Sequence, residues 1–407
     1  MNKNFVKGLA VGIASVVLVE TAGYTVVDKA AQGIGVYVGA DNSALGKNTS
    51  VTLSKMNAVK RYIDQYFMTE VDESNVTEGI YKGMVAGLDD PYSDYYTKEE
   101  YRELMEENSG VYCGIGATVT QDPTTGSIYV VETIEGGAAR EAGLQTGDEI
   151  TKVKGKSVKG KDLSEVVSEM KGKEGTRVEV EVYLNKQKES KVYTMERREV
   201  EVPTVRYEMK EDQMGYVAVS AFEEPTDEQF IKAVEDLKKQ GMKGMIIDLR
   251  NNGGGMLDSV VNMLDYMLPE GKTIVSVKDK NGEGEVYKAK DKREFTLPLV
   301  VLINEYTASA SEVFSGAVKD YRLGSLVGTT SFGKGIVQSV MSLNDGSAIK
   351  LTTARYFTPD GTNIHKKGIK PDVEVTLEAD SKKDTQYNEA VRLLKQKMKA
   401  ESQENNR

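Results

Sequence analysis

The feature that most constrains the fold is an alternation of buried strands and amphipathic helices beyond residue 200. The segments 245–249 and 299–303 are short and mainly apolar, as expected for strands that are covered on both faces. Between them, apolar residues recur at helical spacing over 257–268. Such alternation predicts an α/β layer fold with a largely parallel sheet. Active sites in these folds lie at the carboxyl ends of the strands, so the loops there are the first places to look for chemistry.

The chain upstream of this region has two different hydrophobic periods. Apolar residues follow helical spacing from Ser54 onward, and the sequence Thr97-x-x-Glu100 is typical of a helix N-terminus. After Ser109-Gly110 the period becomes that of strands, with a predicted strand over 114–119 and a short amphipathic helix over 163–170. We therefore predict a small helical region followed by a small β-rich domain.

Residues 1–27 are predicted to be an export segment. Lys3 and Lys7 precede an uncharged, almost wholly apolar run over 8–19, which suits a signal-peptide core better than a full membrane span. An uncleaved membrane anchor and a buried N-terminal helix are the alternatives. Residues 28–53 are predicted to be a tether. The expected location is therefore extracytoplasmic, with the protein either secreted or anchored in the membrane by its N-terminus.

The scarcest residues exclude several kinds of site. One cysteine, Cys113, rules out a disulfide framework within the chain, and one histidine leaves no usual ligand set for structural zinc. We expect no metal and no other cofactor. A Ser-His-Asp triad could form only through His365, which we interpret as an exposed loop residue in a polar stretch. The net charge of −10 argues against a nucleic-acid-binding protein.

Two predicted strand-end loops carry groups suited to acyl transfer. In Asp248-Leu249-Arg250-Asn251-Asn252-Gly253-Gly254-Gly255, three glycines before a helix would expose N–H groups for an oxyanion, although a tight turn would explain one of them. In the loop 304–312, Ser309 stands at a strand-to-helix turn, where the helix dipole favours developing negative charge. The N–H of Ala310 and of one glycine would complete an oxyanion hole. Because Ser309-x-x-Glu312 also fits a capping box, helix capping alone is the alternative.

A third loop, 328–335, supplies a lysine. It contains the G-x-x-x-x-G-K pattern of a phosphate-binding loop, but Gly335 replaces the Ser/Thr that would hold Mg²⁺, and a strand is predicted where that loop needs a helix. Lys334 can instead act as general base for a serine if burial keeps its amine neutral. Gln338 could orient that amine, provided that the chain bends at Gly335.

The β-rich domain resembles a PDZ domain. The resemblance is carried by Gly114-Ile115-Gly116 and by Ala142-Gly143-Leu144-x-x-Gly147-Asp148-x-Ile150, although the proline that the family often has near Ala138 is absent. The N–H groups of the glycine loop would form a nest for the C-terminal carboxylate of a peptide, which would add as a strand beside 116–119. A pair of turn glycines with no ligand is the alternative.

Residues 54–375 resemble the carboxyl-terminal processing proteases, a family of tail-specific serine peptidases. The motifs that carry this resemblance occur in the family's order and are Gly87-Leu88-Asp89-Asp90-Pro91-Tyr92-Ser93, the 248–255 loop, Thr307-Ala308-Ser309-Ala310-Ser311-Glu312, Phe332-Gly333-Lys334-Gly335-Ile336-Val337-Gln338 and Gly368-Ile369-Lys370-Pro371-Asp372. The resemblance implies Ser309, rather than Ser311, as nucleophile. It implies Lys334 as general base and Gln338 as the partner that orients it. It also implies an oxyanion hole formed by the N–H groups of Gly253 and Ala310.

The same resemblance implies the architecture and the partners. We expect a crotonase-like α/β serine protease core with an inserted or leading PDZ domain and N-terminal helices. The predicted boundaries are 54–107 for the helical region, 108–190 for the PDZ domain, 191–376 for the peptidase core and 377–407 for a C-terminal helical tail that packs on the core or forms a dimer contact. Expected partners are protein or peptide substrates with free, apolar C-termini and a second copy of the chain. Contact with a membrane is expected only through the N-terminal segment.

The predicted activity is that of a serine endopeptidase that cleaves proteins near their C-terminus with a Ser-Lys dyad. The PDZ domain would bind the substrate's tail and gate the activity. A catalytically inactive PDZ adaptor for C-terminal peptides is the first alternative. A nucleotide-binding enzyme that uses residues 328–334 is the second.

Overall fold

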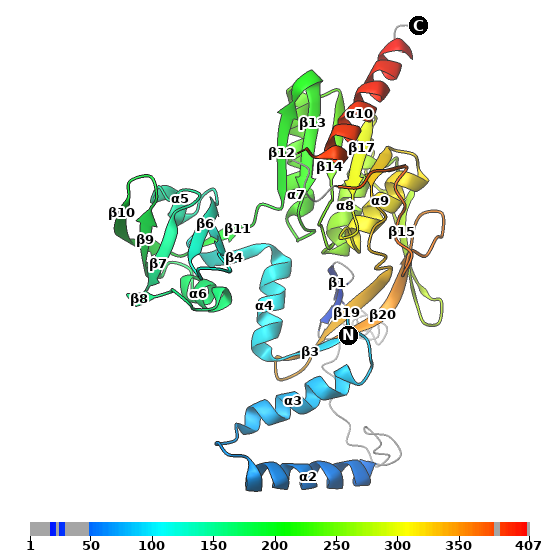
Figure 1. The fold of residues 1–407 in the computed structure, drawn as a ribbon. Coiled ribbons are helices and arrows are strands. Elements are labelled where there is room, and N and C mark those ends of the chain that lie inside the picture. Colours follow the sequence, from blue (N-terminus) through cyan, green and yellow to red (C-terminus); the bar gives the residue numbers. More distant parts are fainter. Residues whose placement is uncertain (1–16, 22–23, 29–48, 378–382, 405–407) are drawn as a thin grey trace, which may run out of the picture. The chain divides into compact units, whose positions relative to one another are not determined.

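The computed structural model describes residues 17–21, 24–28, 49–377 and 383–404 (Figure 1). Most of the predicted export segment and of the predicted tether lies outside these ranges. The chain divides into two compact units, Met1–Arg102 with Ile336–Ala354, and Glu103–Gly335 with Arg355–Arg407. In the described ranges, no helix is both long and apolar enough to cross a membrane.

The first unit joins N-terminal helices to short strands. Its helices are α2 (Thr49–Tyr66), α3 (Glu73–Ala86) and the start of α4 (Lys98–Ser109). The predicted capping box is confirmed, because Thr97 N–H donates to the Glu100 carboxylate (2.8 Å) and Glu100 N–H donates to the Thr97 hydroxyl (3.3 Å). Its strands are β1 (Val17–Thr21), β2 (Tyr24–Asp28), β3 (Asp94–Tyr96), β19 (Ile336–Ser342) and most of β20 (Ala348–Phe357). β2 pairs antiparallel with β1 and parallel with β19, and β3 pairs antiparallel with β20.

The β-rich domain in the second unit is an antiparallel sheet with its own apolar core. The strand order is β10-β9-β7-β6-β5, and β8 pairs with β7. The elements are β5 (Ala117–Gln121), β6 (Ile128–Thr133), α5 (Ala138–Glu141), β7 (Glu149–Val153), β8 (Lys156–Ser157), α6 (Leu163–Met170), β9 (Arg177–Leu184) and β10 (Glu189–Glu196). Helix α6 confirms the predicted helix over 163–170. Side chains such as Ile128, Ile150 and Val166 fill the core between the sheet and the helices.

The single strand predicted over 114–119 is wrong, because the chain turns at Gly116. Gly116 has a φ of 74°, and a Cβ there would lie 2.6 Å from the Cα of Gly137. Only glycine accommodates both the backbone conformation and this close approach. The turn separates β5 from β4 (Val111–Gly114), which pairs instead with β11 (Arg198–Glu201) in a two-stranded ribbon.

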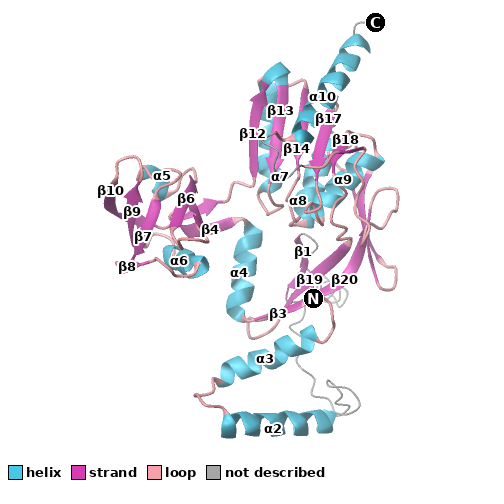
Figure 2. Ribbon diagram, viewed as in Figure 1, coloured by secondary structure: helices cyan, strands magenta, loops and turns pink. Residues whose placement is uncertain are grey.

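The core of the second unit is a largely parallel sheet between helices (Figure 2). The order is β12-β13-β14-β17-β18-β21, and only the β12–β13 pair is antiparallel. The strands are β12 (Val205–Lys210), β13 (Met214–Val219), β14 (Gly244–Asp248), β17 (Leu299–Ile303), β18 (Ser325–Gly328) and β21 (Val373–Glu374). Every residue of β14 and of β17 is buried, which confirms the prediction of strands covered on both faces.

Helices cover both faces of this sheet. The helices of the core are the 3₁₀ turn η1 (Glu211–Gln213), α7 (Thr226–Lys239), α8 (Leu257–Met267), α9 (Ala310–Asp320) and α10 (Thr385–Glu404), and the strands β15 (Thr273–Asp279) and β16 (Gly284–Lys288) form a hairpin. Helix α10 lies in the predicted C-terminal tail, and its Ala390 and Leu394 are buried against Ile246 and Val300 of the sheet. The tail helix therefore packs on the core, which was one of its two predicted roles. The mixed α/β class is confirmed.

Candidate active site

The three loops singled out in the sequence leave neighbouring parallel strands at one edge of the sheet. The 248–255 loop follows β14, the loop with Ser309 follows β17, and the loop with Lys334 follows β18. The sheet order β14-β17-β18 makes these strands neighbours. Because parallel strands end at the same edge, the loops lie side by side, as the strand pattern predicted.

Ser309 is held in an unusual backbone conformation at the start of α9. Its φ is 56° and its ψ is −118°, which non-glycine residues rarely adopt. The residue is 1% exposed, and its N–H donates to the Glu312 carboxylate at 2.9 Å. The capping interaction expected from Ser309-x-x-Glu312 is therefore present. Capping does not require a positive φ at the cap, so surrounding contacts must hold this strained conformation.

The glycine loop lies directly against Ser309. A Cβ on Gly254, whose φ is 104°, would lie 2.8 Å from the Ser309 Cβ and 3.0 Å from the Ala310 nitrogen. A Cβ on the neighbouring Gly253 would meet nothing within 4 Å. Ala310 is the first residue of α9, so its N–H has no acceptor within that helix. The structure thus brings the two segments predicted for an oxyanion hole into contact.

Buried polar side chains fix the glycine loop in place. The Asn252 side chain donates to the Val219 carbonyl and accepts the N–H of Gly254, both at 2.8 Å. The Asn252 carbonyl accepts the N–H of Ala308 at 3.0 Å and the hydroxyl of Ser311 at 3.1 Å. Ser311, the rival nucleophile in the sequence, therefore serves to anchor this loop.

Glu312 joins the serine loop to the lysine loop, a role that the sequence interpretation missed. Its side chain is completely buried. Its carboxylate accepts the N–H groups of Ser309 (2.9 Å), Gly333 (2.7 Å) and Lys334 (2.8 Å) and the hydroxyl of Ser331 (2.5 Å). The N–H groups of Ser309 and Lys334 share one oxygen, Oε2. Burial raises the pKa of Glu312, and the four donors oppose that rise.

The loop with Lys334 is glycine-rich because other backbone passes close on both sides of the lysine. A Cβ on Gly333 would lie 2.9 Å from the Gly368 nitrogen, and one on Gly335 would lie 2.6 Å from the His365 nitrogen. Lys334 itself is half-buried. The prediction that His365 is exposed is wrong, because its backbone packs against Gly335 and the residue is half-buried. The family-like motif that begins at Gly368 is thus explained by its contact with the lysine loop.

Gln338, the predicted orienting partner, lies on β19 in the other compact unit. It is 1% exposed, and its Nε2 donates to the hydroxyl of Thr352 at 3.1 Å. Its buried amide oxygen accepts no hydrogen bond from any residue that the structure describes. The strand β19 confirms the strand predicted after the lysine loop. A nucleotide-binding loop needs a helix at this position, which argues against that alternative.

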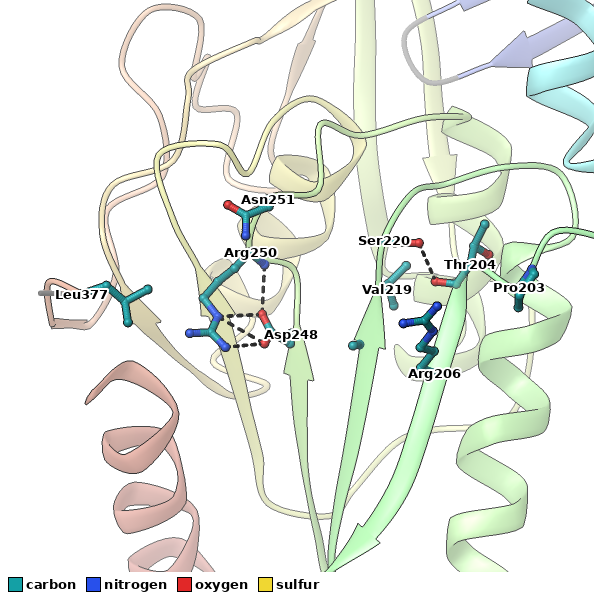
Figure 3. A pocket seen from close by; sticks show the side chains of 10 residues that line it. Pro203, Thr204, Arg206, Val219, Ser220, Asp248, Arg250, Asn251 and Leu377 are labelled. Atoms are coloured by element: carbon teal, nitrogen blue, oxygen red, sulfur yellow. Dashed lines mark hydrogen bonds and ion pairs between the residues drawn. The ribbon is translucent and has the colours of Figure 1, made fainter. Parts of the chain in front are cut away.

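A cavity of about 310 Å³ opens at the carboxyl ends of β13 and β14, beside the glycine loop (Figure 3). It is lined by Pro203, Thr204, Arg206, Ala218, Val219, Ser220, Asp248, Arg250, Asn251 and Leu377. Arg250 binds Asp248 (2.6 Å) and Asp384 (2.9 Å). Burial acts to lower the pKa of its guanidinium, but the two carboxylates together outweigh this and raise that pKa. The start of the glycine loop is therefore locked in place, and Arg206 faces the cavity from β12.

The predicted peptide site of the β-rich domain is a groove of about 240 Å³ between β5 and α6. It is lined by Tyr112, Gly114, Ile115, Ala117, Thr118, Val119, Val167, Met170 and Lys171. Of the three residues predicted for carboxylate binding, Gly114 and Ile115 line the groove. Gly116 does not line it and instead makes the turn, with its carbonyl accepting the Ile134 N–H at 2.9 Å. Tyr112 and Lys171 were not foreseen.

Comparison with known proteins matches three parts of the chain to described families. Residues 213–375 match peptidase family S41, residues 129–184 match the PDZ domain, and residues 21–100 match the N-terminal domain of the activating protease CtpB.

Named relatives cover most of the chain. The carboxy-terminal processing protease CtpA of Bacillus subtilis (strain 168) is 38% identical over 352 residues, which are 85% of this chain and 75% of the relative. A probable CtpA-like serine protease of Staphylococcus aureus (strain MSSA476) is 36% identical over 84% of this chain and 68% of its own length. The solved structure of a photosystem II D1 C-terminal processing protease matches with 31% identity, covering 84% of this chain and 91% of that one, with a TM-score of 0.47. The chain therefore belongs to the carboxyl-terminal processing proteases, serine peptidases of family S41 that contain a PDZ domain.

Proposed function

We propose that this peptidase cleaves protein substrates near their C-terminus with Ser309 as nucleophile and Lys334 as general base. The observation that carries this proposal is the shared carboxylate of Glu312, whose Oε2 accepts the N–H of Ser309 and the N–H of Lys334. A serine on a strained turn and a half-buried lysine are thus tied to one buried group. Such rigid placement is what a nucleophile and its base require.

In the proposed reaction, the Ser309 hydroxyl attacks the scissile carbonyl while the neutral amine of Lys334 takes its proton. The N–H groups of Gly253 and Ala310 stabilise the oxyanion that forms. Lys334 then returns the proton to the leaving amine, and water hydrolyses the acyl-enzyme. Gln338 would orient the lysine.

The PDZ domain would capture the free carboxylate of an apolar substrate tail and gate the peptidase. The groove beside the glycine loop supports this part of the proposal. A direct test compares the cleavage rates of one peptide with a free C-terminus and with an amidated C-terminus. Equal rates would remove the carboxylate from recognition.

We further propose that the protein is exported, with its N-terminal segment as the only contact with a membrane, and that it forms a homodimer. Large apolar side chains are exposed on α2 and α3 and just after α2, which supports a protein–protein contact there. They include Val59, Tyr62, Phe67, Met68 and Met84. Light scattering should give twice the chain mass, and Tyr62→Glu should reduce it to one chain mass. A monomeric wild type would contradict the dimer, and recovery of the protein in the cytoplasmic fraction would contradict export.

The nucleophile can be tested with a peptide that has an apolar C-terminus and with a serine-reactive phosphonate. We expect Ser309→Ala to reduce cleavage by at least about 10³-fold, as loss of a serine nucleophile does in other peptidases. Mass spectrometry of the phosphonate-labelled wild type should place the label on Ser309. Label on Ser311, or cleavage retained by Ser309→Ala, would overturn the assignment. An inactive adaptor would bind the peptide without reacting with the phosphonate.

A further inference from the structure

The glycine loop of the PDZ domain presents one backbone donor to the open edge of the sheet. β5 is the last strand in its sheet, so no strand that the structure describes pairs with one of its edges. Ile134 N–H donates to the Gly116 carbonyl, which makes Ala117 and Thr133 a non-hydrogen-bonded pair. The N–H of Ala117 therefore points away from β6 and towards the groove. A terminal carboxylate bound in a backbone nest would accept this kind of donor.

A tyrosine of the chain itself occupies this position. Tyr112 lies on β4, and its ring lines the groove, with Cε2 only 2.9 Å from the point where a Cβ on Gly114 would lie. Tyr112 and Ala117 line the groove together, and the nearby N–H of Ala117 opposes the rise in the pKa of the Tyr112 hydroxyl. Burial raises the pKa of Tyr112 to about 12, so this hydroxyl is neutral at physiological pH. A neutral oxygen thus lies where a carboxylate oxygen would bind.

A lysine at the same end of the groove carries the charge that a carboxylate would pair with. Lys171 follows the last residue of α6 and lines the groove. Its ammonium lies 5.2 Å from the centroid of the Tyr112 ring and 3.0 Å from the carboxylate of Glu106. In the free protein the cation is therefore held over the tyrosine ring and balanced by one partly exposed acid.

We propose that Tyr112 and Lys171 form the carboxylate-recognition end of the PDZ groove. The Tyr112 hydroxyl keeps the place of a carboxylate oxygen on the Ala117 N–H while the groove is empty. A polypeptide C-terminus displaces this hydroxyl and pairs its carboxylate with the Lys171 ammonium, in competition with Glu106. This inference rests on the proposed capture of substrate tails by the groove, and it names the residues that make capture specific for a free carboxylate.

The test measures binding of a fluorescent peptide with a small apolar C-terminal residue to the full-length Ser309→Ala protein, which cannot cleave it. We expect the Ser309→Ala protein that also carries Tyr112→Phe to bind the free-acid peptide about fivefold more tightly, because the competing hydroxyl is gone. Added Lys171→Gln should bind the free acid about tenfold more weakly, because the charge-assisted contact is lost. Neither change should alter binding of the amidated peptide by more than about twofold.

Matched controls come from a second lysine–tyrosine pair in the same domain. The Lys191 ammonium lies 4.9 Å from the Tyr193 ring on β10, and neither residue lines the groove. Tyr193→Phe and Lys191→Gln should leave both affinities unchanged. If the parent protein binds acid and amide peptides equally, the proposed capture function fails. If it prefers the acid but Tyr112→Phe does not tighten binding, or Lys171→Gln behaves like Lys191→Gln, the present inference is wrong while capture stands.

Discussion

Two glycine loops are proposed to bind negative charge through backbone N–H groups, one at 253–255 in the core and one at 114–116 in the PDZ domain. Each needs glycine where other backbone passes close: Gly254 lies against Ser309, and Gly116 lies against Gly137. Their surroundings differ. The core loop is clamped by the buried Asn252 side chain, whereas the PDZ loop borders an open groove beside an unpaired strand edge. Donors that stabilise a short-lived charge must be fixed in advance, whereas donors that bind and release a chain must be able to change partners.

The largest expected effect is a loss of catalysis at the core site, and it tests the role of Lys334 as general base. Lys334→Arg should reduce kcat/KM for peptide cleavage by at least about 10³-fold, because a guanidinium cannot act as general base at neutral pH. Its backbone is held by its N–H on Glu312 and by the Tyr356 hydroxyl on its carbonyl, and the substitution keeps both groups, so the melting temperature should stay close to that of the wild type. Lys367→Arg changes an exposed lysine in a neighbouring segment and is the matched control. A Lys334→Arg enzyme within tenfold of the wild type would remove the general-base role.

The next effect tests whether catalysis depends on the Glu312 carboxylate, which joins the serine loop to the lysine loop. Glu312→Gln places an amide NH₂ among four donors, so at least one of them loses its acceptor, and we expect a loss of about 10²-fold in kcat. Phosphonate labelling of Ser309 should slow in parallel, while the affinity of the PDZ groove for a peptide should stay the same. Glu305→Gln alters an exposed acid of the serine loop and serves as control. Labelling at the wild-type rate would show that Glu312 only caps the helix.

Two adjacent glycines of the core loop should differ in sensitivity. Gly254→Ala combines a positive φ with a Cβ that clashes with Ser309, and we expect roughly a thirtyfold loss of activity. Gly253→Ala keeps the N–H and adds a methyl group in open space, so it should stay within about threefold. The ratio of the two rates measures how closely the loop must approach the nucleophile. Equal losses would contradict the arrangement described for this edge of the sheet.

The PDZ loop should respond in binding rather than in chemistry. Gly116→Ala should weaken peptide binding by about tenfold and lower the stability of the domain by about 2 kcal/mol, because its Cβ would clash with Gly137. Gly136→Ala has a similar positive φ of 76° but no atom within 4 Å of the new Cβ, so it isolates the contribution of backbone strain. Calorimetry measures both quantities. Identical results for the two variants would mean that the close approach contributes nothing.

Local periodicity predicted the strands and helices well because burial of an apolar face is a local signal. It placed α6 and the capping box before α4 correctly, and it predicted that three strand ends carry the chemistry. The break at Gly116 was missed because the contact that demands it comes from Gly137, twenty-one residues away. The prediction that His365 is exposed was wrong for the same reason, since its burial depends on Gly335.

The role of Glu312 was also beyond a local interpretation. In the sequence it completes a helix cap, and three of its four donors come from residues 331–334, about twenty positions further along. Residue chemistry suggested Ser309 and Lys334 as a pair, and the resemblance to a family selected Ser309 over Ser311, but spacing did not show that their loops meet. The sequence therefore predicts the elements from local patterns, whereas contacts between loops emerge only in the folded chain.

The smallest expected effect concerns the joint between the two regions. Glu223 follows Phe222, whose N–H donates to the Gly254 carbonyl. The Glu223 carboxylate lies 2.8 Å from the position of a Cβ on Gly110, the residue before β4. Burial, and then the charge of Glu107, raise the pKa of Glu223 to about 7. Because the pKa of Glu223 is higher in the folded than in the unfolded state, its protonated carboxyl contributes to the stability of the folded protein. This contribution is complete below about pH 4.5 and is lost as the pH rises through about 7.

Glu223→Gln carries no charge to bury, so at pH 8 it should be more stable than the wild type by up to about 2 kcal/mol. At pH 5 the difference should be small, because the wild-type carboxyl is then mostly protonated in the folded state. Melting temperatures from pH 5 to pH 8 measure the difference in stability between the wild type and Glu223→Gln. Glu224→Gln, at the exposed neighbouring residue, is the control. If wild type and Glu223→Gln change in parallel with pH, Glu223 is ionised in the folded protein, and the joint between the clamped loop and the PDZ ribbon is more hydrated than its burial indicates.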